Sequence, residues 1–161
     1  MMRIGVLVSV LILAAPELAD CADTTKVARG RYLVTVAGCN DCHTAGFAMS
    51  GGKVPESQWL QGDRLGYTGP WGTTYPSNLR LTLGAMDLAT WKHYARTATL
   101  RPPMPYWALN AMDDADLEAL WHFTRALGDP GEPAPAALPP GTEPPLPAFK
   151  LVLPAAQGAI R

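Results

Sequence analysis

The chain of 161 residues is long enough for one compact domain with appendages, and too short for two independent domains of ordinary size. Apolar residues make up 48% of it and charged residues 17%, a balance that excludes a disordered polyelectrolyte. The formal net charge is −1 and neither sign forms a run, so no strong patch for nucleic acid or anionic lipid can be read from the sequence. We expect no nucleic-acid partner.

The N-terminus has the pattern of a secretory signal. Arg3 gives a positive start, residues 4–15 are an apolar stretch, and residues 16–22 lead into small residues suited to cleavage. We expect cleavage after Cys21, which makes residues 1–21 a signal peptide and the mature protein periplasmic. A retained membrane anchor is the alternative, but the apolar stretch is shorter than the ~20 residues that a spanning helix needs.

Cys21 leaves another alternative open, because it stands where a bacterial lipoprotein carries its lipidated cysteine. Asp20 precedes it at a position that normally holds a small residue, which disfavours lipidation. Membrane association is therefore expected only if Cys21 is lipidated or the signal is retained. Removal of Cys21 with the signal would leave two cysteines in the mature chain.

Three later segments have apolar residues at helical spacing, with a capping residue at the start and glycine or proline at the end. They are residues 24–38, 87–100 and 113–128. The third has the strongest pattern, since Leu117 and Leu120 begin a stripe that must be buried. These segments predict a helical domain.

Long segments without helical pattern separate and follow these helices. Residues 44–82 have glycine or proline every few positions and are predicted to form a loop region. A loop of this length is unusual in a compact domain, which indicates that something other than protein fills the core. In residues 129–161 prolines are too frequent for helix or strand, so this tail is predicted to be extended, either wrapped over the domain or loose. The domain itself is expected to span residues 22–128.

The chemical signal of the sequence is Cys39-Asn40-Asp41-Cys42-His43, the C-x-x-C-H motif of covalent haem attachment. On one helical turn the two cysteines and the histidine share a face, so the thiols can bond the two haem vinyl groups while the imidazole points at iron. The motif therefore predicts one covalent haem c, held by Cys39 and Cys42, with His43 as an axial iron ligand. Export is consistent with this, because bacterial c-type haem attachment takes place outside the cytoplasm.

Three other uses of the motif fit the sequence less well. A thioredoxin-like C-x-x-C needs a preceding strand and a βαβ context, whereas a helix is predicted before this one. A zinc site needs more ligands, and besides His43 only His93 and His122 are available, on separate predicted helices. A disulfide between Cys39 and Cys42 would close a ring too small to stabilise the fold much, and it would leave the histidine without a role.

The sixth iron ligand determines what such a haem does. A methionine opposite histidine suits electron transfer, because iron then changes charge with little change in geometry, and methionine raises the potential. Met104 is the predicted ligand, since the flanking prolines of its sequence, RPPMP, stiffen the backbone. Met49, Met86 and Met112 are the alternatives outside the signal, and any methionine can instead fill the core.

In their order, these features resemble class I cytochromes c, which have an N-terminal helix, the attachment motif, a late methionine loop and a C-terminal helix. The resemblance covers about residues 25–127. It implies an all-α cytochrome c fold, with three to four helices and long loops around one covalent haem. It also implies that the first and last helices cross and pack near the haem. The residues that would meet there are Gly30, Tyr32, Leu117, Leu120 and Trp121.

Two segments, residues 70–78 and 104–126, are more narrowly similar to one haem module of the multi-haem cytochrome subunits that serve periplasmic alcohol and sugar dehydrogenases. The chain departs from those subunits in two respects. It has one C-x-x-C-H motif where they have several, so it would not relay electrons through successive haems by itself. In addition, Asn78 is followed by Leu79-Arg80-Leu81, where those modules have Ile-Thr-Pro-Asp.

Two functions follow from these observations. The first is a periplasmic electron carrier, or the small cytochrome subunit of a dehydrogenase or oxidase, which carries one electron and transforms no substrate. Its partner would be a periplasmic dehydrogenase, an oxidase or another cytochrome. The second is a gas-binding or peroxide-handling haem protein with a labile sixth ligand, which requires Met104 to be a filler or a weak ligand.

Overall fold

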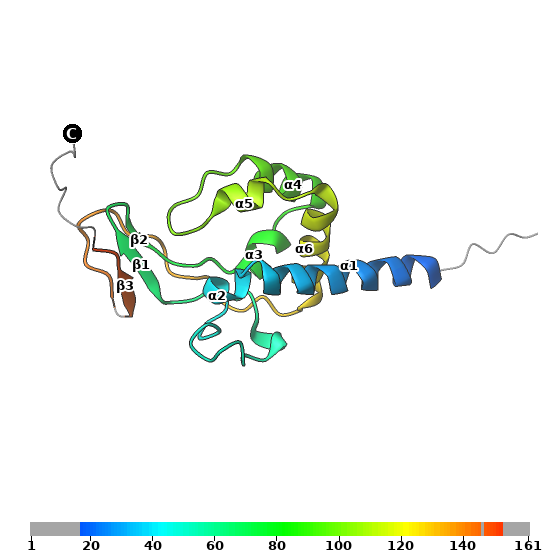
Figure 1. The fold of residues 1–161 in the computed structure, drawn as a ribbon, viewed down its shortest axis with the longest axis horizontal. Coiled ribbons are helices and arrows are strands. Elements are labelled where there is room, and N and C mark those ends of the chain that lie inside the picture. The colour runs from blue at the N-terminus through cyan, green and yellow to red at the C-terminus, as the bar shows by residue number, and fades with distance from the viewer. Residues whose placement is uncertain (1–16, 146, 153–161) are drawn as a thin grey trace, which may run out of the picture.

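A computed structural model gives the fold of residues 17–145 and 147–152 (Figure 1). Most of the predicted signal peptide, residues 1–16, lies outside the described residues. Within the described part of the chain, every helix is too short or too polar to cross a membrane.

The described chain is mainly helical and has one small sheet. In chain order its elements are α1 (Glu17–Val36), α2 (Cys39–His43), η1 (Glu56–Gln58), β1 (Gly66–Gly69), β2 (Gly72–Thr74), α3 (Leu79–Gly84), α4 (Leu88–Thr97), α5 (Tyr106–Asn110), α6 (Asp114–Ala126) and β3 (Ala148–Lys150). The predicted helical class is confirmed. There are more helices than the three to four expected, and the sheet is an addition to the predicted architecture.

The first and last helices, α1 and α6, form the most extensive contact between elements, as the resemblance implies. Gly30 permits the close approach, because a Cβ built at this position would lie 2.2 Å from the backbone oxygen of Ala119. Leu33 and Val34 are buried beside it. Tyr32 differs from the expectation, since it is 55% exposed.

The helix predicted to begin near Asp87 is α4. The carboxylate of Asp87 accepts a hydrogen bond from the backbone N–H of Thr90 (2.7 Å), which caps the helix. The buried indole N–H of Trp91 donates to the backbone oxygen of Leu117 (2.8 Å) and joins α4 to α6. Asp113 precedes α6 as predicted, although its side chain makes no capping hydrogen bond.

The predicted loop region, residues 44–82, contains more regular structure than expected. β1 and β2 form an antiparallel hairpin in which Gly69 lies opposite Gly72. The side chain of Asn78 caps α3 by accepting a hydrogen bond from the backbone N–H of Leu81 (3.1 Å). These elements are three to six residues long, too short for a periodic pattern to identify them.

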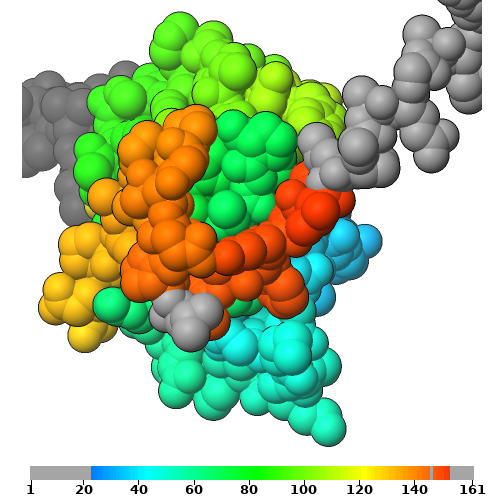
Figure 2. All heavy atoms as spheres, turned by 90° about the vertical axis from the view of Figure 1, so that its left-hand side faces the viewer, coloured from blue at the N-terminus to red at the C-terminus, as the bar shows by residue number. Residues whose placement is uncertain are grey.

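The C-terminal tail wraps over the domain, which is the first of the two predicted alternatives. The main chain of Leu138 exchanges hydrogen bonds of 3.1 and 2.9 Å with that of Thr73. Further on, β3 pairs in parallel with β1, giving the sheet order β2-β1-β3. In Figure 2 the orange and red tail, which includes β3, crosses in front of the green segment that contains β1 and β2. The prediction that the tail contains no strand is wrong at β3, because pairing with a distant strand forms it.

Candidate haem site

The C-x-x-C-H motif forms the whole of α2, a single helical turn. Gly38, directly before it, has a φ of 68°, and this left-handed conformation lets the chain turn sharply from α1 into α2. As predicted, the motif lies on a helical turn, which groups Cys39, Cys42 and His43 on one short element.

The two motif cysteines are free thiols, each partly buried, so the disulfide alternative is not supported. Burial raises the pKa of the Cys39 thiol to about 11. A thioredoxin-like site needs a strand before the motif, whereas α1 precedes it, so this redox alternative is not supported either. From β1, the hydroxyl of Tyr67 donates to the sulfur of Cys42 (3.6 Å). Burial, and then this hydrogen bond, raise the pKa of Tyr67 and keep the hydroxyl protonated.

His43 is buried and its ring is oriented by the backbone. Its Nδ1 lies 2.7 Å from the carbonyl oxygen of Ser77. A carbonyl only accepts hydrogen bonds, so Nδ1 carries the hydrogen and Nε2 keeps its lone pair. Metal-binding histidines typically have this arrangement. Burial lowers the pKa of His43 and favours the neutral imidazole, the form that binds a metal.

Two neighbouring segments hold the backbone around His43. The N–H of Gly62 donates to the carbonyl oxygen of His43 (2.8 Å), and the N–H of Leu60 donates to the hydroxyl of Thr44 (2.8 Å). The carbonyl of Leu60 in turn accepts from the N–H of Leu79 (2.9 Å). The segment 59–62 therefore fixes the backbone of His43, and it is itself joined to the segment that begins with Ser77.

Sequence reasoning did not identify Gly62 or Ser77 as site residues. Ser77 acts through its carbonyl, which every residue has, so its identity gives no signal. Gly62 has a φ of 82°, and a Cβ there would lie 2.8 Å from the backbone oxygen of Pro76. Glycine is thus required at position 62, but a glycine within a glycine-rich loop does not indicate this from sequence alone.

Several buried polar atoms also bear on whether a haem fits. The hydroxyls of Tyr75 and Thr74 and the amide nitrogen of Asn40 have no hydrogen-bond partner among the described residues. Buried polar groups in proteins are normally paired. The two hydroxyls, which stand two and three residues before Ser77 in the chain, are groups that can donate to the carboxylates of a porphyrin. The free thiols and the free Nε2 suit its vinyl groups and iron. The residues present therefore fit a haem c.

Met104 lies outside this group, in the loop between α4 and α5. It is partly buried, its N–H donates to the carbonyl of Arg101 (3.2 Å), and its own carbonyl accepts from the N–H of Tyr106 (2.9 Å). Figure 1 draws this loop above α2, with β1 and β2 to the left of both. The structure thus brings the two cysteines and the histidine together on one turn, whereas Met104 comes from a separate segment.

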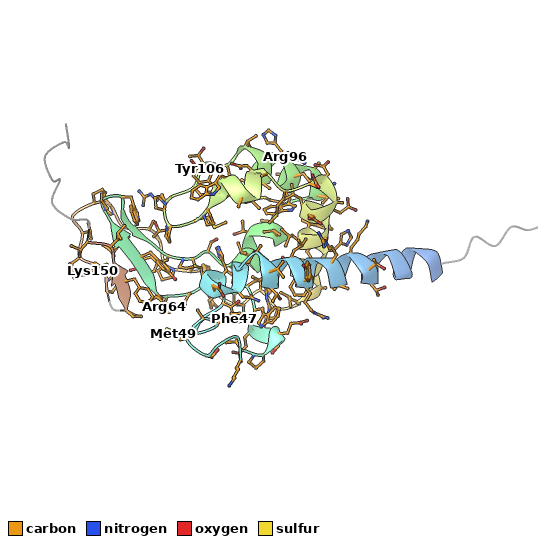
Figure 3. All side chains as sticks on the ribbon, in the orientation of Figure 1. Phe47, Met49, Arg64, Arg96, Tyr106 and Lys150 are labelled. Carbon is orange, nitrogen blue, oxygen red and sulfur yellow. The ribbon has the colours of Figure 1, made fainter. Side chains whose placement is uncertain are left out.

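The other candidate methionines have different surroundings. Met49, which is labelled in Figure 3, is 82% exposed. Met86 and Met112 instead pack against the apolar core. The remaining histidines are accounted for as well, since His93 is exposed and His122 pairs with Asp23 (2.5 Å). No cluster of three or more histidine, cysteine or acidic side chains that could bind a metal is found in the described residues, so the zinc alternative is not supported.

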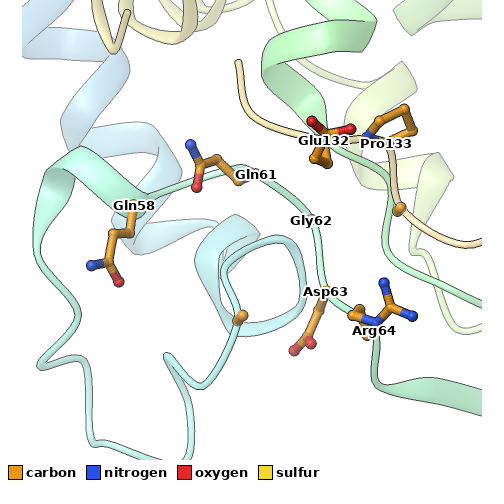
Figure 4. A pocket seen from close by; sticks show the side chains of 9 residues that line it. Gln58, Gln61, Gly62, Asp63, Arg64, Glu132 and Pro133 are labelled. Carbon is orange, nitrogen blue, oxygen red and sulfur yellow. The ribbon is translucent and has the colours of Figure 1, made fainter. Parts of the chain in front are cut away.

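A surface hollow of about 360 Å³ lies between residues 58–64, which follow α2 in the chain, and residues 132–134 of the tail. Figure 4 shows Gln61, Asp63 and Arg64 on one side of it, with Glu132 and Pro133 on the other. Its lining is rich in polar side chains and contains none of the four predicted site residues. It is a surface hollow that shares Gly62 with the surroundings of His43 but contains no residue of the motif itself.

No protein-family model and no solved structure matches the chain significantly. Among curated proteins, the sequence is similar to the cytochrome c subunit of alcohol dehydrogenase (quinone) from Gluconacetobacter polyoxogenes and from Komagataeibacter europaeus. Each is 31% identical over 127 residues, which cover 70% of this chain and 24% of the relative. The chain thus spans about a quarter of the length of these relatives. The similarity supports the predicted likeness to dehydrogenase-associated cytochrome subunits.

Proposed function

We propose that the chain is a c-type cytochrome that carries one electron on one covalently bound haem. The observation that carries the proposal is the geometry of α2, where two free thiols share a helical turn with a histidine whose Nε2 is left unprotonated by the Ser77 hydrogen bond. The similarity to cytochrome c subunits supports the same function. The single C-x-x-C-H motif in the sequence supports one haem rather than several.

Each site residue has a distinct part in this function. Cys39 and Cys42 would hold the haem through thioether bonds, and His43 and Met104 would bind its iron. The bound group would supply a one-electron iron couple. The protein orients the imidazole through the Ser77 carbonyl and buries it, which favours the neutral form that binds a metal.

We further propose that the mature protein is periplasmic, with residues 1–21 as signal peptide, 22–128 as cytochrome domain and 129–161 as tail. Cleavage after Cys21 would fall within α1 and remove residues 17–21 from that helix. The names of the relatives favour a dehydrogenase as redox partner, with an oxidase or another cytochrome as alternatives. In this role the chain transforms no substrate itself, and it associates with a membrane only if Cys21 is lipidated or the signal is retained.

A redox titration of the purified protein, produced in a host with c-type haem maturation, tests the function. We expect reversible reduction by one electron per chain, with sharp α and β bands in the reduced protein. The double variant Cys39→Ala/Cys42→Ala serves as control and should lack these bands. A wild-type protein that shows no reversible one-electron transition would contradict electron carriage.

A further inference from the structure

Arg80 is a buried charge without an ion pair. It is 4% exposed, yet no described carboxylate lies within ion-pair distance of its guanidinium. Charged side chains are almost never buried in this way unless they are paired, because removal from water is costly. Arg80 belongs to Leu79-Arg80-Leu81, the segment in which the chain departs from the dehydrogenase-associated modules.

Main-chain carbonyls take the place of a carboxylate. The guanidinium donates to five of them, with distances between 2.7 and 3.4 Å: those of Glu56, Ser57, Trp59, Leu127 and Asp129. The carbonyls of Glu56 and Ser57 belong to η1, and that of Trp59 follows it directly. Leu127 is the C-terminal cap of α6. Carbonyls at the ends of helices carry partial negative charge, so they stabilise the cation. They are dipoles, however, and the net positive charge of Arg80 remains inside the protein.

Arg80 connects the two segments that orient His43. Its side chain and its backbone N–H both bind the segment 56–60, the latter through the carbonyl of Leu60 (3.4 Å). That segment continues to Gly62, which holds the backbone of His43. Arg80 itself lies three residues after Ser77, which holds the imidazole ring. Its hydrogen bonds therefore brace both supports of the predicted iron ligand.

Resting on the proposed haem, we propose that Arg80 is a positioning residue of the site: its guanidinium braces the segments that orient His43, and its charge favours the reduced iron. Reduction adds one negative charge at the metal, which a cation buried in the same domain stabilises. A buried charge is screened little by salt, so its effect should persist at high ionic strength.

Four substitutions separate the charge from the bracing. Arg80→Gln removes the charge and most of the bonds, while Arg80→Lys keeps the charge and loses the five-carbonyl geometry. Asp129→Asn removes the exposed carboxylate whose field acts on Arg80, and leaves the side-chain oxygen that accepts from the Gly131 N–H. Arg64→Gln is the matched control, because it removes the same charge from an exposed arginine beside the site (Figure 3).

Potentials measured on holoprotein at low and high salt test the charge. We expect Arg80→Gln to shift the redox equilibrium towards the oxidised form by roughly tenfold, about 59 mV for one electron, at both salt concentrations. Arg80→Lys and Arg64→Gln should stay near the wild-type potential, and Asp129→Asn should raise it at low salt. A wild-type potential in Arg80→Gln overturns the charge effect, as does an equal fall in Arg80→Gln and Arg80→Lys. If Arg80→Gln retains no haem, a fall of about 59 mV in Arg80→Lys, which keeps the charge, overturns the charge effect.

Electron paramagnetic resonance of the ferric proteins tests the bracing, since its g values depend on the orientation of the axial ligands. We expect changed g values in Arg80→Lys and wild-type values in Arg64→Gln. Wild-type g values in Arg80→Lys overturn the bracing. These outcomes are distinct from a failure of the proposed function, in which the wild-type protein itself would contain no haem or show no reversible one-electron transition.

Discussion

At the residue scale, the candidate site depends on which ring nitrogen of His43 carries its hydrogen. The Ser77 carbonyl, 2.7 Å from Nδ1, can only accept, so it selects the tautomer that leaves Nε2 free. Burial acts in the same direction, because it lowers the pKa of His43 and opposes protonation of the remaining nitrogen. A single backbone hydrogen bond thus turns a buried histidine into a candidate metal ligand.

The proposed role of Met104 can be tested by its removal. Met104→Ala should lower the potential, abolish the methionine–iron absorption near the red end of the oxidised spectrum, and let carbon monoxide bind the reduced protein, because the sixth position becomes open. Met49→Ala is the matched control, since Met49 is 82% exposed. An unchanged spectrum in Met104→Ala, or ready carbon monoxide binding by the wild type, would favour the gas-binding alternative.

Whether the sequence alone identifies a site residue depends on whether that residue acts within a local motif or through contacts that involve backbone groups of distant segments. Cys39, Cys42 and His43 act through side chains at a characteristic spacing, so the motif identifies them. Ser77 acts through its carbonyl, and Arg80 through carbonyls 21 to 49 residues away. Neither kind of contact leaves a local pattern that a reader of the sequence can detect.

At the element scale, the packing of α1 on α6 requires a glycine at the point of contact. In Gly30→Ala the new methyl group would lie 2.2 Å from a backbone oxygen, and the helices would have to separate. We expect a net loss of about 1–3 kcal/mol in the free energy of unfolding, because this overpacking exceeds the gain in helix propensity. Denaturant unfolding of the holoprotein measures this loss in the free energy of unfolding.

Gly84→Ala is the control for Gly30→Ala. Gly84 also lies in a helix, α3, but nothing stands within 4 Å of a Cβ placed there. This substitution should be neutral or stabilising by up to about 1 kcal/mol. Equal stability changes in the two variants would contradict the close approach of α1 and α6.

An ion-pair network also joins these helices. Glu118 on α6 accepts from Lys26 of α1 (2.5 Å) and from Lys92 of α4 (3.0 Å), and these hydrogen bonds lower its pKa from 4.5 to about 2. A carboxyl whose pKa is lowered on folding stabilises the fold above its unfolded pKa. That contribution is lost as the pH falls through the folded pKa, here between about 4.5 and 2.

Glu118→Gln should therefore lower the free energy of unfolding near pH 7, by about 1 kcal/mol or less per pair because the carboxylate is partly exposed to solvent. The difference from the wild type should shrink between pH 4.5 and about 2. Glu132→Gln, which removes an exposed carboxylate from the tail, should leave both quantities nearly unchanged. A difference that stays constant down to pH 2 would contradict the network.

The sequence predicts the long helices and fails to predict the short ones. The helical periodicity and caps identify α1, α4 and α6, and α1 begins earlier than its predicted cap. The five-residue α5 and six-residue α3 are shorter than two turns, so no periodicity can appear. The two-strand hairpin was missed for the same reason, because its strands have only three and four residues.

At the scale of the whole molecule, the C-terminal tail crosses the domain as a strap. Residues of the domain leave space for this strap and form hydrogen bonds with it. Gly72 lies so close to it that a Cβ there would be 2.2 Å from the backbone oxygen of Leu138. The side-chain amide of Asn78 donates to the carbonyls of Pro130 (2.5 Å) and Glu132 (3.0 Å). The sequence predicted an extended tail but left its course open, because these contacts join residues more than 50 positions apart.

Truncation after Asp129 should free the β1–β2 hairpin while leaving the helices in place. The N–H groups of Thr73 and Gly66, which donate to the tail at Leu138 (3.1 Å) and Pro147 (3.0 Å), would lose their partners and exchange faster with solvent. Amide hydrogen exchange in α4, which Figure 1 draws away from the sheet, provides the internal control. Unchanged exchange of both hairpin amides would show that the strap does not hold the hairpin.

All of these expectations about redox chemistry depend on a covalent bond between the chain and a haem. The most direct measurement is the intact mass and free-thiol count of the mature protein purified from a host that attaches c-type haem. We expect one haem per chain, retained in denaturant, with Cys39 and Cys42 both blocked. A protein of the unmodified mass, with both thiols free to react, would contradict it.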